Sequence, residues 1–491
     1  MEPAATIDYK ELYAQSQLDI LQLKEQLSQL KKMIFGSKQE RFVPTDPNSP
    51  QLTLDMQVES IAACNIAAAK KITYIKTTVE VEKKSLQHPG RTRLPENLRR
   101  EPIVIEPSGD MSGLKKMGEE ITEVLEFQPG ELFVKKYIRP KYAKPNNEGV
   151  VIGELPSRPL EKAMAGPGLL AQIVIDKYVD HLPLHRQMQR FDRSGVKLPY
   201  STLTDWVSST CKLIEPLFGA LKKEVLQSNY LHVDETPIRV MDRDKKGETH
   251  RGYYWVYQNS INKTVFFDYQ QGRGREGPLE ILEHFKGHLQ TDGYTAYEIF
   301  DKRPGITLMH CMAHARRMFN EALENDSARA EYAMEQIQKL YAIERECKQQ
   351  ELSFEEIREV REEKSIQVLT ALGEWMKTQY MQVTPKSAIG KALAYSIERW
   401  KRLSLYTSNG MLNIDNNPVE NSIRPVALGR KNYLFAGSHE AARRSGMFYS
   451  LLSTCKMHGI EPTEWLKDVL EKIANHPVNK VYQLLPHHWN K

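Results

Sequence analysis

Two acidic residues of this 491-residue chain stand where a carboxylate needs a partner. Asp234 lies within LHVDETPIRV, whose pattern predicts a β-strand, and a lone carboxylate among apolar neighbours is costly unless it is paired or binds a metal. Asp292 ends the apolar run GHLQT just before Gly293, where ligands approach the strand ends of α/β sheets. Neighbouring strands would let both carboxylates share a divalent cation, which prefers oxygen ligands.

The neighbours of these acids leave alternatives open. Asp292-Gly293 is also a common turn pair. Because side chains alternate along a strand, we expect only one of Asp234 and Glu235 to join the site. We choose Asp234, which shares a face with His232 and Thr236.

Glu420 is the third acidic candidate. In DNNPVENS, Asn417 suits the N-cap of a helix and Pro418 its first position, which places Glu420 at N3. A carboxylate in a first helical turn can reach a neighbouring sheet edge. A glutamate at N3 can instead close a capping box, so the spacing alone does not decide.

The elements that carry these acids predict a ribonuclease H-like domain. Three closely spaced strand patterns (LHVDETPIRV, GYYWVYQ and KTVFFDY) indicate an antiparallel meander. A helix over 278–285, the strand GHLQ, the helix TAYEIF, the strand GITLMH and the helix AHARRMFNEALEN follow. The order βββαβαβα is that of the ribonuclease H-like fold, in which the first and fourth strands are adjacent.

The 127 residues between Asp292 and Glu420 are more than this fold needs. Ser353 and Glu356 stand in capping-box register, and SAIGKALAYSIERWKRL is amphipathic. The pattern predicts an α-helical insertion in the catalytic domain.

Three shorter helices are predicted ahead of this region. They cover Pro167 to Tyr178, the segment from Pro183 to Gly195, and a third helix with Ser201 as its N-cap. This rhythm is typical of a helix-turn-helix, whose last helix enters a DNA groove, so we select Ser201, Thr202 and Thr204 as DNA-binding candidates. A three-helix connector packed on the catalytic domain is the alternative.

The first hundred residues carry two further patterns. Apolar residues at heptad spacing over 9–34 predict a coiled coil or one amphipathic helix docked on its own protein. The stretch 83–100 holds six Lys or Arg and one acid, so it either neutralises phosphates or is a solvated linker. The alternating segments ITEVLEF and LFVKKYIR predict a small β-rich module.

Composition limits the class of protein. With 40% hydrophobic and 27% charged residues the chain matches a globular protein, and neither a membrane-spanning run nor a secretory signal is expected. Five scattered cysteines without a CxxC pair exclude a disulfide framework and a four-cysteine zinc ribbon. We expect an intracellular protein, and its net charge of +5 does not diagnose DNA binding.

Several motifs carry a family resemblance. HVDETPIRV, LQTDGYTAY, CMAHARRMF and DNNPVENSIRPVALGRKNYLFAGS together resemble the IS66 family of bacterial insertion-sequence transposases, from about residue 9 to about residue 460. KYVDHLPLHRQMQRF, LPYSTLTDWV and KKMIFGSKQERF resemble it as well. The resemblance implies a DDE transposase with Asp234, Asp292 and Glu420 as the catalytic, metal-binding triad.

Cysteine usage marks one departure from the family. Many relatives carry a cysteine-bearing zinc module before the helix-turn-helix, whereas residues 85–150 contain no cysteine. We therefore expect that module to keep its fold without zinc, and predict no zinc. Cys311 and His314 form a CxxH pair before Arg316 and Arg317, which we interpret as a structural pair near the site.

A basic segment is expected beside the triad. Residues 429–432, with Arg430, Lys431 and Asn432, are predicted to follow the Glu420 helix, and Arg424, Arg443 and Arg444 lie close to them in the sequence. These residues are DNA-binding candidates, with a merely solvated helix as the alternative.

The function expected is cleavage at terminal inverted repeats and 3′-hydroxyl strand transfer with two Mg²⁺, or Mn²⁺ in their place. Expected partners are DNA, a second or further copies of the chain, and accessory proteins of the element, in the bacterial cytoplasm at the nucleoid and away from membranes. Two alternatives remain: a nuclease that cleaves without joining, and a non-catalytic DNA-binding regulator or scaffold.

The predicted fold class is thus a multidomain α/β (α+β) protein. Its parts are a coiled-coil helix at 1–45, a linker at 46–84, the cysteine-free β module at 85–155, the helical DNA-binding segment at 160–228, the catalytic core at 229–325 and 413–491, and the helical insertion at 326–412.

Overall fold

The computed structural model describes residues 94–489, apart from 95, 97, 108, 110–114, 129, 146–148, 162 and 243–246. The predicted coiled coil, the linker and most of the basic stretch at 83–100 lie outside the described residues. Within the described part, no helix is both long enough and apolar enough to cross a bilayer.

A small mixed sheet occupies the segment predicted as a β module. Its strands are β1 (Arg100–Val104), β2 (Lys115–Gln128), β3 (Glu131–Ala143) and β4 (Val150–Ile152). β2 and β4 pair antiparallel with β3, and β1 pairs parallel with it. Buried Glu126 of β2 accepts a hydrogen bond from the Leu169 amide at 3.2 Å. A carboxylate suits the positive end of a helix, so Glu126 ties the sheet to the helix that begins at Pro167.

Three helices follow, namely α2 (Pro167–Tyr178), α3 (Leu184–Arg193) and α4 (Tyr200–Leu226). The prediction of Ser201 as an N-cap is wrong, because Pro199 precedes the first turn and no side chain caps it. α4 also runs well past the predicted segment and through Pro216. Its second half buries Leu217, Leu221 and Val225 in the core shared with the central sheet, and this packing offsets the hydrogen bond that proline removes.

The central sheet has the order β7-β6-β5-β8-β9. Its strands are β5 (Tyr230–Met241), β6 (Thr249–Asn259), β7 (Thr264–Gln270), β8 (Gly287–Thr291) and β9 (Ile306–His310). The meander β5-β6-β7 is antiparallel, and β8 and β9 run parallel to β5. The adjacency predicted for the first and fourth strands is therefore observed.

The segments between these strands are shorter or tighter than predicted. α5 covers Glu276–Ile281 rather than 278–285. TAYEIF lies in a 3₁₀ helix, η2 (Thr295–Lys302), and α6 (Met312–Glu321) follows β9.

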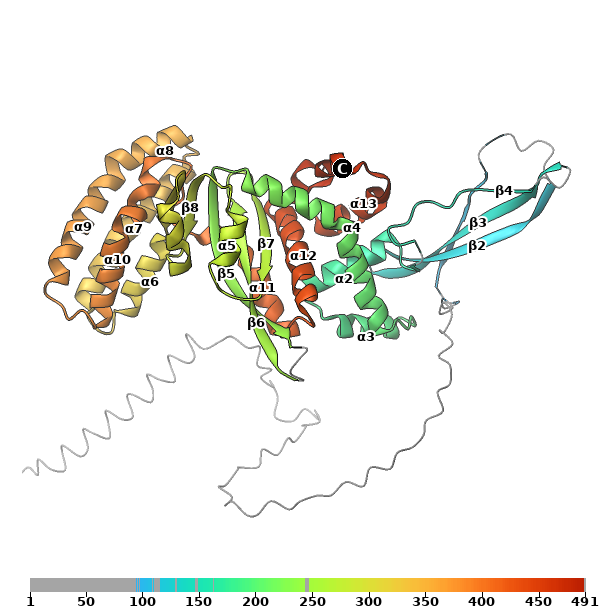
Figure 1. The fold of residues 1–491 in the computed structure, drawn as a ribbon, viewed down its shortest axis with the longest axis horizontal. Coiled ribbons are helices and arrows are strands. Elements are labelled where there is room, and N and C mark those ends of the chain that lie inside the picture. The colour runs from blue at the N-terminus through green and yellow to red at the C-terminus, as the bar shows by residue number, and fades with distance from the viewer. Residues whose placement is uncertain are drawn as a thin grey trace, which may run out of the picture. The chain divides into compact units, whose positions relative to one another are not determined.

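The free edge of β7 is covered by a helix. The last three α-helices along the described chain are α11 (Asn417–Tyr433), α12 (His439–Met457) and α13 (Pro462–Lys472), and α12 runs beside β7 (Figure 1). The Ser450 hydroxyl accepts a hydrogen bond from the Phe267 amide at 2.8 Å, and Thr454, one helical turn later, accepts one from Val265 at 3.4 Å. These hydroxyls satisfy amides that an edge strand would otherwise leave open to another chain.

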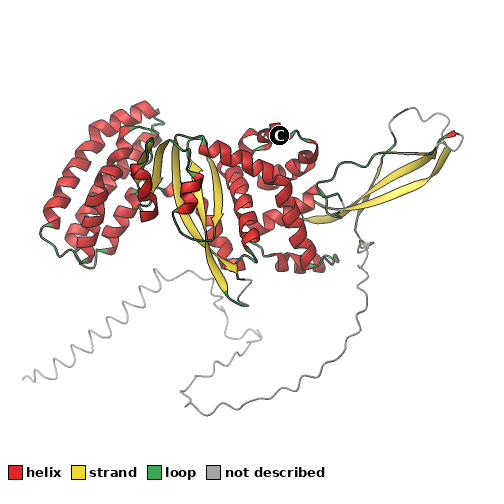
Figure 2. Cartoon of the chain, viewed as in Figure 1, coloured by secondary structure: helices red, strands yellow, loops and turns green. Residues whose placement is uncertain are grey.

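A second core lies in the helices of residues 327–404. They are α7 (Ser327–Gln349), α8 (Phe354–Val360), the π-helical η3 (Arg361–Ser365), α9 (Ile366–Tyr380) and α10 (Ala388–Ser404), grouped at one side of the central sheet (Figure 2). Their apolar core includes Tyr230, Met309 and Met312 from the sheet region. The capping box predicted for Ser353 and Glu356 is confirmed, with Ser353 N to Glu356 Oε2 at 2.8 Å.

His310 at the end of β9 makes stability sensitive to acid. Burial, with the charges of Arg402 and Arg399 from α10 and against that of Asp301, lowers its pKa from 6.5 to about 3. The unfolded chain therefore binds a proton here over a pH range in which the native protein does not. We expect the free energy of unfolding to fall as pH drops below 6.5 toward 3, by up to about 1.4 kcal/mol per pH unit from this group.

His310→Gln removes that proton uptake. Urea unfolding from about pH 4 to 7 should give a flatter pH dependence for this variant than for the wild type. His185→Gln, at an exposed position of α3, serves as control. Equal slopes in the wild type and His310→Gln would contradict the prediction.

Candidate active site

Asp234 and Asp292 meet where the parallel ladder of β5 and β8 ends. The last paired residues are His232 and Gln290, so Asp234 lies two residues beyond the ladder and Asp292 directly follows β8. Oxygen atoms of Asp234, Glu235 and Asp292 lie within 4.8 Å of one another. The structure thus brings together the first two acids selected from the sequence.

Glu235 corrects the prediction that only one of two strand neighbours joins the cluster. Side chains alternate along any extended strand, but the ladder with β8 ends at His232, so the edge of β5 beside Asp234 and Glu235 is open. At this open edge both carboxylates reach the same space.

Glu235 has charge partners of its own. Arg273 donates to its Oε1 from Nε at 2.8 Å, and the Tyr297 hydroxyl donates to its Oε2 at 2.9 Å. The guanidinium also stacks on Tyr294, 3.9 Å from the ring centroid. Because these groups already occupy its oxygens, Glu235 is less available to a ligand than Asp234.

Asp234 is the most perturbed acid of the cluster. Burial raises its pKa well above 3.8, and the charges of Glu235, Asp292 and Glu420 raise it further, against a 2.7 Å hydrogen bond from the Glu235 amide. Burial and the Asp292 charge also raise the pKa of Glu235, while Arg273 lowers it. Like charges crowded in a half-buried site favour either a bound proton or a bound cation.

Asp292 is also part of a turn, as its alternative interpretation predicted. Its Oδ1 accepts a hydrogen bond from the Tyr294 amide at 2.8 Å, and Gly293 has a φ of 88°, which favours glycine. The turn engages one carboxylate oxygen and fixes the direction of the other. The turn and a ligand role are therefore compatible.

α10 brings two residues to this turn that sequence reasoning missed. The Tyr395 hydroxyl donates to the Asp292 carbonyl at 2.9 Å, and the Arg399 guanidinium lies 4.3 Å from the Tyr395 ring centroid. Arg399 Nε is buried without a hydrogen-bond partner, near Gly293. No local signal marks these residues, because α10 is about a hundred positions from Asp292 and only tertiary contact joins them.

Glu420 lies in the first turn of α11, but not in the predicted position. Asn416, not Asn417, is the N-cap, and the Glu420 amide donates to the Asn416 carbonyl. Glu420 is thus one residue too far along for a capping box, so that alternative is excluded. Its Oε1 is buried without a hydrogen-bond partner.

His314 connects Glu420 with the aspartates. Its Nδ1 lies 4.0 Å from Glu420 Oε1, and Cys311, His314 and Glu420 offer ligand atoms within 4.8 Å of one another. Burial lowers the pKa of His314, while the charges of Asp292 and Glu420 raise it. Arg316 and Arg317 are exposed on α6. The CxxH pair therefore lies beside Glu420, and the charges of both Glu420 and Asp292 act on His314.

Asn416 holds α11 against the sheet. Its Nδ2 donates to the Val233 carbonyl at 3.0 Å, which identifies Oδ1 as the acceptor of the His232 Nδ1 proton at 2.9 Å. His232 Nε2 then accepts from Asn413 Nδ2 at 3.1 Å. Burial lowers the pKa of His232 to about 4, consistent with this neutral ring. The backbone N–H of Asn416 also donates a hydrogen bond to Cys311 Sγ at 3.2 Å.

Three of the DNA-binding candidates line one cavity of about 390 Å³, although they come from different elements. These are Thr204 of α4, Asn432 of α11 and Arg444 of α12. Lys177 lies in the same cavity, 4.8 Å from the Tyr433 ring centroid, and burial lowers its pKa to about 8. The cavity is thus bordered by two cationic side chains.

The other DNA-binding candidates are dispersed. Arg424 borders a separate groove of about 950 Å³, Arg443 pairs with Glu440, and Arg430 donates to the Pro237 carbonyl. Ser201 and Lys431 are exposed, and Thr202 is half-buried. Residues 429–432 form the last turns of α11 rather than following it, which corrects the sequence prediction. Arg430 therefore supports the fold, and no single basic face contains all the candidates.

Fold and site together define an α/β protein whose mixed sheet collects carboxylates at the end of a parallel strand pair, beside a helical bundle. Residues 162–444 match the family described as Transposase IS66 family, and residues 450–487 match the IS66 C-terminal element. The chain belongs to the IS66 transposase family, as its sequence motifs predicted. Residues 22–103 match Transposase C of IS166 homeodomain, mostly outside the described residues.

Similar proteins come from Sinorhizobium fredii (strain NBRC 101917 / NGR234). The chain is 31% identical to Uncharacterized protein y4hP, over 96% of this chain and 89% of that relative. It is 29% identical to Uncharacterized protein y4jD, over 96% of this chain and 95% of that relative. The names of these relatives give no activity, so the chemistry must be argued from the site.

Asn416 provides a test of how the site is assembled. Asn416→Ala removes the hydrogen-bond partner of His232 Nδ1 and a donor to the Val233 carbonyl in a buried place, which we expect to cost about 2–5 kcal/mol of unfolding free energy. Asn421→Ala, an exposed asparagine of the same helix, should change stability by less than about 0.5 kcal/mol. Denaturant unfolding measures both, and similar small effects would show that the Asn416 contacts do not hold α11.

Proposed function

We propose that this chain is a DDE-type DNA transposase. It would cut DNA at the terminal inverted repeats of an insertion sequence and join the freed 3′-hydroxyl to target DNA. The observation that carries the proposal is the convergence of Asp234 and Asp292 where the β5–β8 ladder ends, with the Glu420 carboxylate close enough to raise the pKa of Asp234 further and its Oε1 4.0 Å from His314 Nδ1.

The sheet supports assignment of a ribonuclease H-like catalytic domain. The antiparallel meander and the adjacency of its first strand with the fourth agree with the sequence prediction, and β8 and β9 extend the sheet in parallel with β5. The helices of residues 327–404 are inserted in the sequence between β9 and α11. They separate two parts of this domain along the chain, but they do not interrupt the sheet.

The acidic cluster suits Mg²⁺, or Mn²⁺ in its place. Burial and the neighbouring carboxylates raise the pKa of Asp234, and the buried Glu420 Oε1 has no hydrogen-bond partner, so both acids would gain from a cation. Oxygen ligands match the preference of these ions. Asp234, Asp292 and Glu420 would hold the metal, which supplies Lewis-acid stabilisation of the phosphoryl oxygens and lowers the pKa of a bound water.

The surrounding residues position the acids and the DNA. The Glu235 and Tyr294 amides orient Asp234 and Asp292, while Arg273 and Tyr297 occupy Glu235. Arg399 offers a buried, unpartnered Nε–H donor next to Asp292, and an arginine there suits a phosphodiester oxygen. In-line displacement by water or by a 3′-hydroxyl then requires no covalent protein nucleophile.

The proposed setting follows from this chemistry. The substrates are transposon ends and target DNA, at the nucleoid in the bacterial cytoplasm. Joining two ends requires two active sites, which favours a dimer or a larger assembly on DNA. Accessory proteins of the same element are further proposed partners.

Removal of one acid tests the catalytic proposal. Asp234→Asn and Asp292→Asn should lower strand transfer by at least about 10³-fold, because each removes a charge that would hold the metal. Binding of inverted-repeat DNA should remain. The assay uses full-length protein, terminal DNA and Mg²⁺, with Glu331→Gln, an exposed acid of α7, as control.

The products separate the alternatives. Retained joining by either variant would exclude this triad. Cleavage without joining by the wild type would indicate a nuclease, and DNA binding without cleavage would indicate a regulator or scaffold.

The cavity shared by α4, α11 and α12 tests DNA binding independently. Arg444→Ala should weaken binding of terminal DNA and reduce by about one the slope of log affinity against log salt, since one phosphate contact is lost. Lys467→Ala, an exposed cation on α13, should leave both quantities unchanged. Binding curves at several salt concentrations measure the effect, and equal slopes for both variants would exclude a phosphate contact at Arg444.

A further inference from the structure

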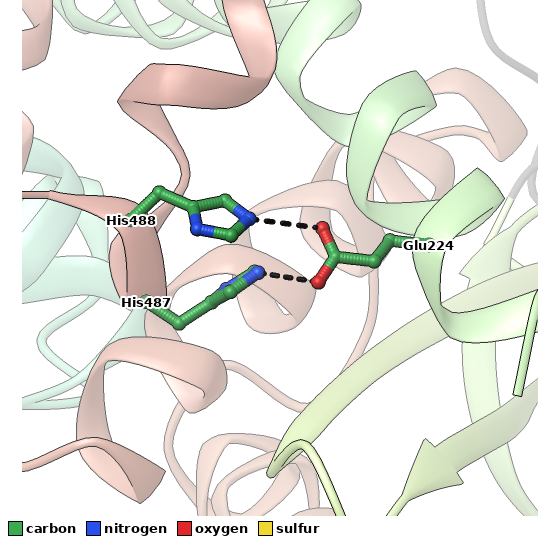
Figure 3. A group of neighbouring side chains, drawn as sticks. All are labelled: Glu224, His487 and His488. Carbon is green, nitrogen blue, oxygen red and sulfur yellow. Dashed lines mark hydrogen bonds and ion pairs between the residues drawn. The ribbon is translucent and has the colours of Figure 1, made fainter.

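A second group of possible metal ligands lies far from the acids on the chain and has no role in the proposed reaction. Glu224 of α4 faces His487 and His488 of η7 (Pro486–His488), and both rings point toward its carboxylate (Figure 3). His487 Nε2 lies 2.6 Å from Glu224 Oε1, and His488 Nε2 lies 3.5 Å from Oε2. The three ligand atoms are within 4.8 Å of one another.

The chemistry of this donor set differs from that of the acidic cluster. Burial lowers the pKa of His487, with the neighbouring imidazoles His488 and His458 contributing and the Glu224 charge opposing. A neutral imidazole offers a lone pair, and two imidazoles with one carboxylate suit zinc and related transition metals. Mg²⁺ prefers oxygen ligands and would favour the aspartates.

We propose that Glu224, His487 and His488 form a zinc-type metal site that fastens η7 to α4. The ion would take one carboxylate oxygen and two imidazole nitrogens, with water completing its coordination. In the structure, a hydrogen bond between His487 Nε2 and Glu224 occupies this place; for the ion to bind Nε2, the ring would take the other neutral tautomer, with its proton on Nδ1.

Contacts around the cluster position the ligands before an ion binds. Trp465 Nε1 donates to the Leu484 carbonyl at 3.0 Å, and Trp489 Nε1 donates to Asp468 Oδ2 at 2.8 Å. These bonds anchor the chain on both sides of the histidine pair to α13. A site whose ligands are already positioned loses less entropy when the ion binds.

An ion can reach the cluster from solvent. The His488 side chain is 45% exposed and that of Glu224 is 25% exposed, whereas His487 is 9% exposed. The site thus has one buried ligand that fixes its position and one open side for entry. The absence of suitably spaced cysteines led to the prediction of no zinc, and no local pattern joins Glu224 to His487, because 263 positions separate them.

The experiment uses the full-length protein and ZnCl₂ in isothermal titration calorimetry, with excess Mg²⁺ present to occupy the acidic cluster. We expect a zinc site that His488→Ala and Glu224→Gln each weaken by at least about 10-fold. His284→Ala, at an exposed histidine beside α5, should retain wild-type affinity.

Thermal unfolding is the second measurement. Zinc should raise the melting temperature of the wild type by about 2 °C or more over an EDTA control, and this rise should be absent in His488→Ala. Unchanged zinc affinity in both His488→Ala and Glu224→Gln, or no zinc binding by the wild type, would overturn the proposal. These outcomes are independent of strand transfer, so they do not depend on the proposed catalytic role.

Discussion

The Asn416 side chain joins two parts of the chain that are 183 positions apart, and the arrangement of the site depends on it. One amide group both accepts from His232 and donates to Val233, so the beginning of α11 is fixed to the first part of β5. Since α11 carries Glu420, this contact determines whether a third carboxylate approaches the two aspartates. A buried amide with both functions satisfied is a demanding arrangement, because any shift of α11 would leave polar groups unpaired.

Crowded negative charge is the second constraint on this edge of the sheet. Asp234, Glu235 and Asp292 lie together where β5 and β8 separate, and their repulsion costs free energy in the absence of a cation. The protein offsets part of this cost through Arg273, which pairs with Glu235. The carboxylates of Asp234, Asp292 and Glu420 are the basis of the proposed divalent-metal chemistry.

The helical bundle of residues 327–404 has its own apolar core and also contacts the site. Tyr395 binds the Asp292 carbonyl, and Arg399 lies against the same turn. Tyr341 of α7 donates to Asp415, which also binds the Asn417 amide just before Glu420. The bundle therefore contacts the chain next to both Asp292 and Glu420, and it helps to orient acids that come from opposite ends of the insertion.

The sequence by itself determined the succession of strands and helices along the central domain, the adjacency of its first and fourth strands, the helical character of the insertion, and the family. It also identified Asp234 and Asp292, because apolar alternation and turn residues are local signals that a single segment carries. Only the tertiary structure decided that Glu235 shares the open edge of β5, that Arg399 and Tyr395 reach Asp292, and that α11 begins at Asn417. The same holds for Glu224 with His487 and His488. These arrangements arise from contacts between distant segments, whose distances depend on packing that no local pattern encodes.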